Sequence, residues 1–259
     1  MQVVSEKTAI VTGASQGIGR AIAVRLARDG ASTVLCARSR EALDAAVQEI
    51  RQTGGKAAAI ALDLRLPDAP ARLAEFAVAT FGRINVVVNN AGATKRGDFF
   101  ELTDEDWADG FALKFFGAVR LTRAAWPHLK AAGGSVVNIA GVGGRTPGAD
   151  FTIGGSVNAA MATFTKAMAD VGLRDGVQVN LINPGSIRTE RFQKRLVTLA
   201  MEKGVSIDAA ERQFAADARV TKIGDPSEIA ALVAFIVGPE GRLFHGSLID
   251  MDAGATKTV

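Results

Sequence analysis

The chain has 259 residues, 48% of them hydrophobic, which is enough for one globular domain with a sizeable core. Thirty Lys and Arg against 27 Asp and Glu leave a formal net charge of +3 without blocks of like charge, so we expect no nucleic-acid partner. No apolar stretch is long enough to span a membrane and residues 1–7 lack a secretion signal, so we expect a cytoplasmic protein with no membrane partner.

Short apolar runs rich in β-branched residues alternate along the chain with longer segments of helical periodicity. Continuous apolar strands are typical of a parallel sheet that helices cover on both faces. The alternation predicts a single-domain α/β fold, a doubly wound, Rossmann-like parallel sheet of about seven strands. The predicted strands are 8–11, 32–37, 58–62, 84–88, 135–139, 177–182 and 246–251.

Capping signals and charge mark three helical regions. Thr103, followed by three acidic residues, predicts the start of a long helix, with Pro127 near its other end. Asp225 before Pro226 predicts the start of the last long helix. The polar, charged segment at about 189–219 has a helical pattern and interrupts the strand–helix alternation. It is either an inserted segment that covers the substrate site or a solvated pair of surface helices.

A glycine pattern, Thr12-Gly-Ala-Ser-Gln-Gly-Ile-Gly19, lies between the first predicted strand and the first predicted helix. In that context Gly13 allows a tight turn, Gly17 lets the backbone approach a pyrophosphate, and Gly19 lets the helix pack on the strand. The helix N-terminus adds free N–H groups. The predicted contacts to a dinucleotide cofactor are Gly13, Ser15, Gln16, Gly17, Ile18 and Gly19.

The end of the second predicted strand indicates which dinucleotide is bound. An NAD site usually places a carboxylate there against the ribose hydroxyls. This chain instead reads Cys36-Ala-Arg38-Ser-Arg40, and Arg38 can accept a 2′-phosphate. NADP is therefore the predicted cofactor, with NAD as the alternative. Cys36 itself lies in an apolar run and is expected to be a buried strand residue rather than a reactive thiol.

With its three-residue spacing between the first two glycines, the pattern resembles that of the short-chain dehydrogenase/reductase family. Further motifs carry the same resemblance along essentially the whole chain: Asp63-Leu64, Asn89-Asn-Ala-Gly92, Asn183-Pro-Gly-Ser-Ile-Arg-Thr189 and Asp252-Ala-Gly254. By resemblance, Asp63 and Leu64 hold the adenine, while Asn90, Ala91 and Gly92 line the path to the nicotinamide. The residues implied to hold the nicotinamide carboxamide are Pro184, Gly185, Ile187 and Thr189.

The residues that the resemblance implies for catalysis are missing. Family members typically carry a tyrosine acid/base, a lysine four residues later, a serine and an asparagine, but this chain contains no tyrosine. The alignment places Gly154 at the tyrosine, Asn158 at the lysine, Gly141 at the serine and Lys114 at the asparagine position. The atypical active site therefore lacks the usual proton donor.

Two of these changes are reciprocal, because Lys114 and Asn158 stand where the family has asparagine and lysine. We predict that Lys114 and Asn158 are the catalytic residues, with partial burial lowering the pKa of Lys114 into a proton-transfer range. A bound water is another candidate proton source. The alternative for Lys114 is a side chain that extends to solvent or serves a subunit contact.

Two functions follow. The first is an NADP(H)-dependent oxidoreductase that transfers a hydride between cofactor and a small carbonyl or alcohol substrate. The second is a catalytically inactive nucleotide-binding sensor or partner subunit, favoured by glycines at catalytic positions. The glycines also suggest room for a bulky substrate, with walls from Phe115, Phe116, Phe151 and Phe192. The resemblance implies a homodimer or homotetramer, and two His and one Cys far apart indicate no metal site.

Overall fold

A parallel sheet forms the centre of the protein. The computed structural model describes residues 4–258, so residues 1–3 of the opening segment and residue 259 lie outside it. Within this range seven strands pair in the order β3-β2-β1-β4-β5-β6-β7, all parallel. The predicted fold class is confirmed. The strands are β1 (Thr8–Thr12), β2 (Ser32–Ala37), β3 (Lys56–Ala61), β4 (Val86–Asn89), β5 (Ser135–Ile139), β6 (Gln178–Pro184) and β7 (Leu248–Met251).

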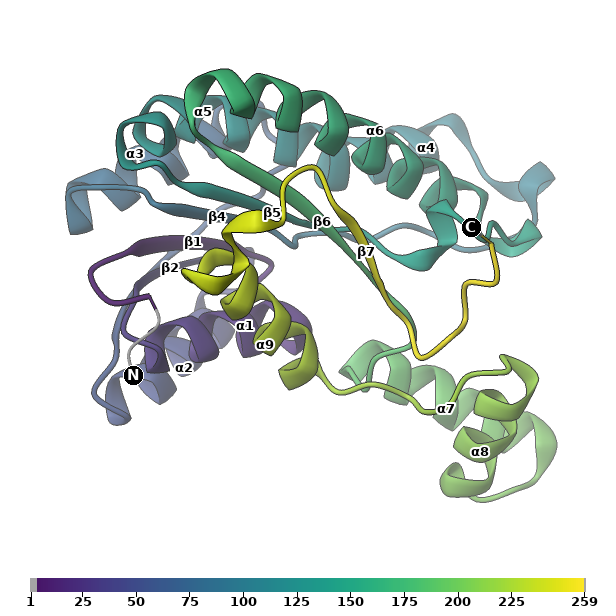
Figure 1. Ribbon diagram of the computed structural model, residues 1–259. Helices are drawn as coiled ribbons and strands as arrows, with labels where there is room; N and C mark the ends of the chain where they lie inside the picture. The colour runs from purple at the N-terminus through teal and green to yellow at the C-terminus, as the bar shows by residue number, and fades with distance from the viewer. Residues whose placement is uncertain (1–3, 259) are drawn as a thin grey trace.

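Helices cover both faces of the sheet (Figure 1). α1 (Gly17–Arg28), α2 (Arg40–Gln52) and α9 (Pro226–Val237) lie on one face. The other face carries α3 (Ala69–Phe81), α4 (Asp104–Phe111), α5 (Gly117–Ala132) and α6 (Thr152–Asp175). Short 3₁₀ turns lie at Phe99–Glu101, Val142–Gly144, Ala149–Phe151 and Glu240–Leu243.

The alternation of side chains along the strands explains the continuous apolar runs. In β1, Ala9 and Val11 are buried in the core with α1 and α9, whereas Ile10 is buried in the core with α3 and α5. Both sets must be apolar because both faces are covered. β3 begins two residues before the predicted start and β7 two residues after it, both at the edges of the sheet.

The order of the strands indicates where a ligand binds. β1 lies between β2 and β4, so the chain winds away from β1 in both directions. In such sheets ligands bind beyond the carboxyl ends of the strands at this point. The motifs that follow β1, β2, β4, β5 and β6 therefore meet at one edge.

One long helical run crosses the second face of the sheet. It begins at α4, where Thr103 and Asp106 form a capping box as the sequence predicts. It continues through a π-helical segment, Ala112–Phe116, into α5. Pro127 lies inside α5, near its end, as the sequence predicts. π-Helical turns are frequent at functional sites, and this one contains Lys114.

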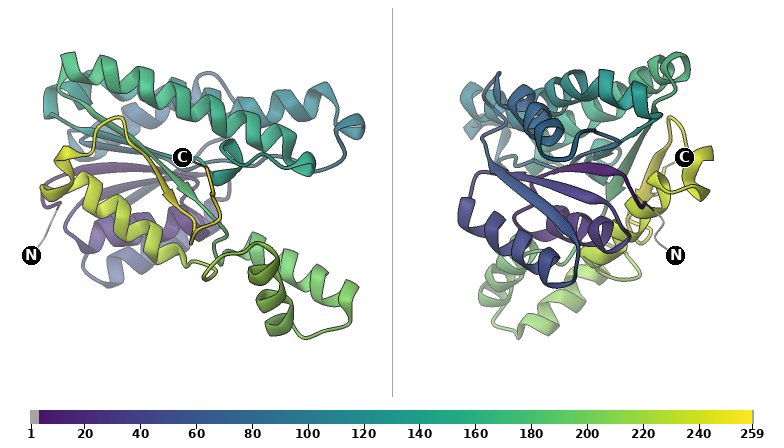
Figure 2. Two further views of the ribbon diagram at one scale, coloured as in Figure 1. Left: turned by 45° about the vertical axis from the view of Figure 1, so that its right-hand side comes forward. Right: turned by 90° about the vertical axis from the view of Figure 1, so that its left-hand side faces the viewer.

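The segment predicted to be helical at 189–219 contains α7 (Glu190–Lys203) and α8 (Ile207–Asp217). Figures 1 and 2 show these two helices projecting from the body of the protein beyond the end of β6. They are held together by Phe192 and Leu196 of α7 and Phe214 of α8. In the described range, no helix is long and apolar enough to cross a membrane.

Candidate active site

The glycine turn after β1 leaves no room for side chains. Gly13 has a φ of 65°, and a Cβ on it would lie 2.9 Å from the side-chain nitrogen of Asn90. A Cβ on Gly19 would overlap the carbonyl oxygen of Gly13. A Cβ on Gly17 would lie 3.2 Å from a methyl group of Thr189. The predicted tight turn and close helix–strand packing are therefore present, and only glycine suits them.

The N-terminus of α1 is open for an anion. Gln16 occupies the N-cap position but its side chain makes no capping hydrogen bond, and the first turn contains no acidic residue. The first N–H groups of a helix have no partner within the helix and carry positive potential. Ser15 and Ile18 are half-buried beside this turn. The arrangement fits the pyrophosphate of a dinucleotide.

Arg38 lies exposed just after the end of β2. No carboxylate lies within 4 Å of it in the part of the chain that the structure describes, whereas Arg65 pairs with both Asp63 and Asp109. Asp63 also accepts a hydrogen bond from the Arg65 backbone at 3.0 Å, and Leu64 is buried. Arg38 is therefore the cation at this end of the crevice that is free to pair with a phosphate.

The segment after β4 is held to the glycine turn by hydrogen bonds. The side chain of Asn90 donates to the carbonyl oxygen of Thr12 at 2.9 Å. The hydroxyl of Thr12 accepts from the backbone N–H groups of Asn90 and Ala91 at 2.9 and 3.0 Å. Asn90 thus braces the turn rather than pointing along the predicted cofactor path. The sequence did not indicate this bracing role of Thr12, although Thr12 is the first residue of the glycine pattern.

The residues after β6 divide between core and crevice. Gly185 is constrained, because a Cβ on it would lie 2.7 Å from Asp252 Cα. Ile187 is buried against α9, so its side chain belongs to the core. Thr189 caps α7 by accepting a hydrogen bond from the backbone N–H of Phe192 at 3.4 Å. Of this group, Thr189 is the residue whose side chain reaches the glycine turn.

Lys114 and Asn158 meet at the centre of the same edge. The Lys114 Nζ donates to Asn158 Oδ1 at 2.7 Å and to the carbonyl oxygen of Ala140 at 2.8 Å. The lysine side chain passes over Gly92, where a Cβ would lie 2.9 Å from Lys114 Cδ. Lys114 therefore points into the site, and the alternative that it extends to solvent is wrong.

The environment of Lys114 changes its acidity. Burial lowers the pKa of Lys114 from 10.5 to about 7, and the nearby positive charge of Arg191 acts in the same direction. Arg191 is the first basic residue of α7, and its guanidinium donates to the carbonyl oxygen of Gly92 at 3.2 Å. A lysine with this pKa exchanges its proton near neutral pH.

Phe151 fills the space above Gly154. A Cβ on Gly154 would overlap the ring of Phe151, and a Cβ on Gly143 would lie 2.9 Å from the same ring. Gly141 is close to Asn158, because a Cβ there would lie 3.1 Å from Asn158 Nδ2. The expectation that Gly154 opens space for a bulky substrate is therefore wrong.

Two other predicted substrate walls are also wrong. Phe192 is buried between α7 and α8, where its ring packs edge-on against Phe214 at 5.2 Å. Phe115 packs against Phe164 of α6 at 6.0 Å, within a core cluster. The sequence alone does not show which neighbouring helix each of these aromatic side chains packs against.

Other reactive groups do not contribute to the site. Burial raises the pKa of the Cys36 thiol to about 12, so this strand residue is an inert core side chain as predicted. Across residues 4–258, no group of three or more His, Cys, Asp or Glu side chains is placed to hold a metal ion.

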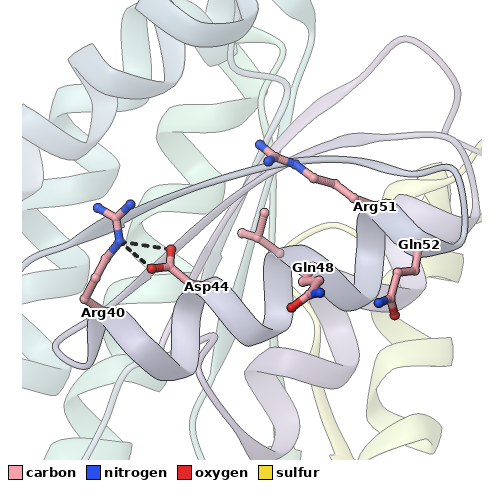
Figure 3. Close-up of a pocket in the computed structure, with 6 residues that line it drawn as sticks. Arg40, Asp44, Gln48, Arg51 and Gln52 are labelled. Carbon is pink, nitrogen blue, oxygen red and sulfur yellow. Dashed lines mark hydrogen bonds and ion pairs between the residues drawn. The ribbon is translucent and has the colours of Figure 1, made fainter.

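A surface depression of about 600 Å³ lies along α2 (Figure 3). Its lining residues all come from this one helix, and Arg40 is paired with Asp44 at 2.9 Å. Exposed polar side chains of a single helix, including Arg51 and Gln52, offer no converging groups. We therefore locate the functional site at the carboxyl edge of the sheet.

Known proteins resemble this chain along most of its length. A model of the short chain dehydrogenase family matches residues 7–199. The chain belongs to the short chain dehydrogenase family. It is 35% identical to an uncharacterized oxidoreductase of Mycobacterium tuberculosis over 253 residues, which cover 97% of this chain and 92% of the relative. A short-chain reductase of Streptomyces niveus is 33% identical over 97% of this chain and 95% of its own length.

Solved structures of family members superpose closely on the chain. L-Sorbose reductase from Gluconobacter frateurii, complexed with NADPH and L-sorbose, is 30% identical with a TM-score of 0.95 and full coverage of both chains. A short chain dehydrogenase from Burkholderia cenocepacia, in complex with NADP, is 32% identical with a TM-score of 0.86, covering 98% of this chain and 99% of its own. The predicted class, a short-chain oxidoreductase, is confirmed.

Proposed function

We propose that this short-chain dehydrogenase interconverts a carbonyl compound and an alcohol with NADP(H). Structural neighbours carry NADPH or NADP. The site of this chain fits the same cofactor, because the glycine turn admits a pyrophosphate and Arg38 stands unpaired where a 2′-phosphate requires a cation. When bound, NADPH supplies the hydride for reduction.

The proton for this reaction comes, in our proposal, from Lys114. Its ammonium group has three hydrogens, and Asn158 and Ala140 accept two of them. The third hydrogen is available for a substrate oxygen. Asn158, 4% exposed, positions the lysine. The observation that carries the proposal is this inward-pointing ammonium, which takes over the role of a tyrosine in a chain that has none.

The acidity of Lys114 dictates a pH dependence. Burial lowers its pKa to about 7, so below pH 7 the group is an ammonium that can donate a proton. Carbonyl reduction should therefore be fastest below pH 7 and fall about tenfold per pH unit above it. Alcohol oxidation needs the neutral amine and should rise with pH to a plateau above 7.

A screen of carbonyl compounds for NADPH oxidation at 340 nm tests the proposal. We expect Lys114→Met to lower kcat about 10²- to 10⁴-fold, because a general acid is lost, while the Kd of NADPH changes little. Lys56→Met is the control, since it removes an exposed lysine at the start of an edge strand.

The outcomes separate the candidate functions. If Lys114→Met keeps the full turnover of the wild type, Lys114 is not the proton donor, and a bound water is favoured as the proton source. Tight NADPH binding without turnover across the screen would favour the alternative, a catalytically inactive sensor or partner subunit. The overlap of Phe151 with the space beside Gly154 is the observation that supports that alternative. Failure to bind either NADPH or NADH would contradict the cofactor assignment.

We also propose that α7 and α8 cover the substrate and that the chain forms a homodimer or homotetramer. Arg191 at the start of α7 already contacts Gly92 beside Lys114, which supports the covering role. Exposed apolar side chains outside the site support assembly, with Phe116 44%, Phe235 42% and Leu243 95% exposed. Light scattering should give a mass of two or four chains, and a monomer would contradict the assembly.

A further inference from the structure

Basic side chains gather where the start of α7 meets the loop after β4, which we call the entrance to the site. The guanidinium of Arg191 donates to the Gly92 carbonyl at 3.2 Å, and its charge acts on Lys114. Arg195 lies one helical turn further along α7, on the same face as Arg191. No carboxylate approaches Arg191 or Arg195 within 4 Å among residues 4–258. The start of α7 thus presents two guanidinium groups that lack a carboxylate partner. That of Arg191 lies beside the proposed proton donor, and that of Arg195 lies over the ring of Phe214, 4.8 Å from its centre.

A third guanidinium reaches the same place from the loop after β4. Arg96 lies over the ring of Phe151, 3.9 Å from its centre, and pairs with Asp150 at 2.8 Å. Burial lowers the pKa of Arg195, and the positive charge of Arg96 lowers it further. The negative charge of Asp150 raises it. Arg96 and its partner Asp150 are therefore close enough to Arg195 for their charges to act on it.

Two basic side chains next to these arginines are paired with carboxylates. Arg188, at the preceding turn, is balanced by Glu211 and Asp225 at 2.5 and 3.3 Å. Lys95, beside Arg96, pairs with Asp106 at 2.8 Å. Arg191 and Arg195 have no such carboxylate among residues 4–258. Like charges held together repel, and an anion that enters between them removes the repulsion.

We infer that the substrate of this enzyme carries a carboxylate, which Arg191 and Arg195 bind at the entrance while its carbonyl group lies at Lys114. This inference rests on the proposed function and adds the substrate class. Guanidinium groups bind carboxylates through paired hydrogen bonds, which fixes orientation as well as affinity. Arg96, already paired with Asp150, adds to the potential without being required for the contact.

Matched substrates test the inference. NADPH oxidation is measured at pH 6 with three pairs: acetoacetate, levulinate and benzoylformate, each against its methyl ester. At this pH the acids are ionised and Lys114 is protonated in every variant, which separates substrate binding from the effect of Arg191 on the lysine. We expect kcat/KM for the acids to exceed that for the esters at least tenfold.

The variants identify the residues. In Arg191→Gln/Arg195→Gln the ratio of acid to ester should fall at least tenfold, whereas Arg212→Gln, which removes an exposed arginine of α8, should keep the wild-type ratio. Esters that react as well as acids would overturn the inference. So would a double variant that loses acid and ester activity equally, or that weakens NADPH binding instead.

A binding readout keeps the test independent of turnover. If no pair is reduced, benzoylformate binding to the NADPH complex is still measured through the fluorescence of the nicotinamide, and the proposed function is decided separately by the broader screen of carbonyl compounds. A Kd at least tenfold weaker in the double variant, and for the methyl ester, would support the carboxylate site. Equal Kd values in wild type and double variant would overturn it.

Discussion

The two halves of the carboxyl edge differ in what defines them. The cofactor half, around Gly13 and Gly19, is shaped by main chain that leaves no space for a Cβ. The reaction half, around Lys114 and Asn158, is shaped by side chains that bond to each other at 2.7 Å. Backbone geometry tolerates few sequences, whereas a hydrogen-bonded pair of side chains can be exchanged as a unit.

In our proposal, this difference lets the reaction half take up a different proton donor while the cofactor half stays the same. The long helix and α6 lie opposite each other, and each supplies one member of the pair. Exchanging lysine and asparagine between them keeps one ammonium and one amide in the same space. The space beside Gly154 is filled by the ring of Phe151. Variants in each half can break or sharpen this comparison.

The largest effect is expected in the cofactor half, from Gly19→Ala. The new Cβ would overlap the Gly13 carbonyl and displace the turn, so we predict NADPH binding at least 100-fold weaker by fluorescence titration. Gly97→Ala is the matched control, since its Cβ would meet nothing closer than 3.6 Å. Unchanged affinity in Gly19→Ala would show that the close packing does not define the cofactor half.

A smaller effect is expected from Arg38→Gln. Losing one charge-assisted contact to a phosphate should weaken NADPH binding about tenfold and leave NADH binding nearly unchanged. Arg40→Gln is the control, because Arg40 is paired with Asp44 on the exposed side of α2 (Figure 3). Equal losses for both cofactors would contradict the assignment of Arg38 to the 2′-phosphate.

The sequence predicted the cofactor half better than the reaction half. Glycine positions report backbone constraints directly, so the turn at Gly13 and the packing at Gly19 could be predicted. The exchange between Lys114 and Asn158 was visible, but the direction of the lysine side chain was not, because it depends on helices distant in sequence.

The basic entrance was missed for a related reason. Arg96, Arg191 and Arg195 stand in polar segments, where charged residues usually belong to a solvated surface. Only the fold brings α7 next to the loop after β4 and shows which of these arginines lack a carboxylate. Phe192 was assigned to the substrate site because its contact with Phe214 of the neighbouring helix cannot be read from one sequence.

The central claim is that Lys114 is poised to transfer a proton, and a titration of its amino group tests this without a substrate. Lysine side chains carrying ¹³C at Cε are followed by NMR from pH 5 to 11, and the resonance missing in Lys114→Met identifies the residue. The account predicts a midpoint near pH 7, because burial and Arg191 lower the pKa. A midpoint above pH 10, shared with exposed lysines, would contradict it.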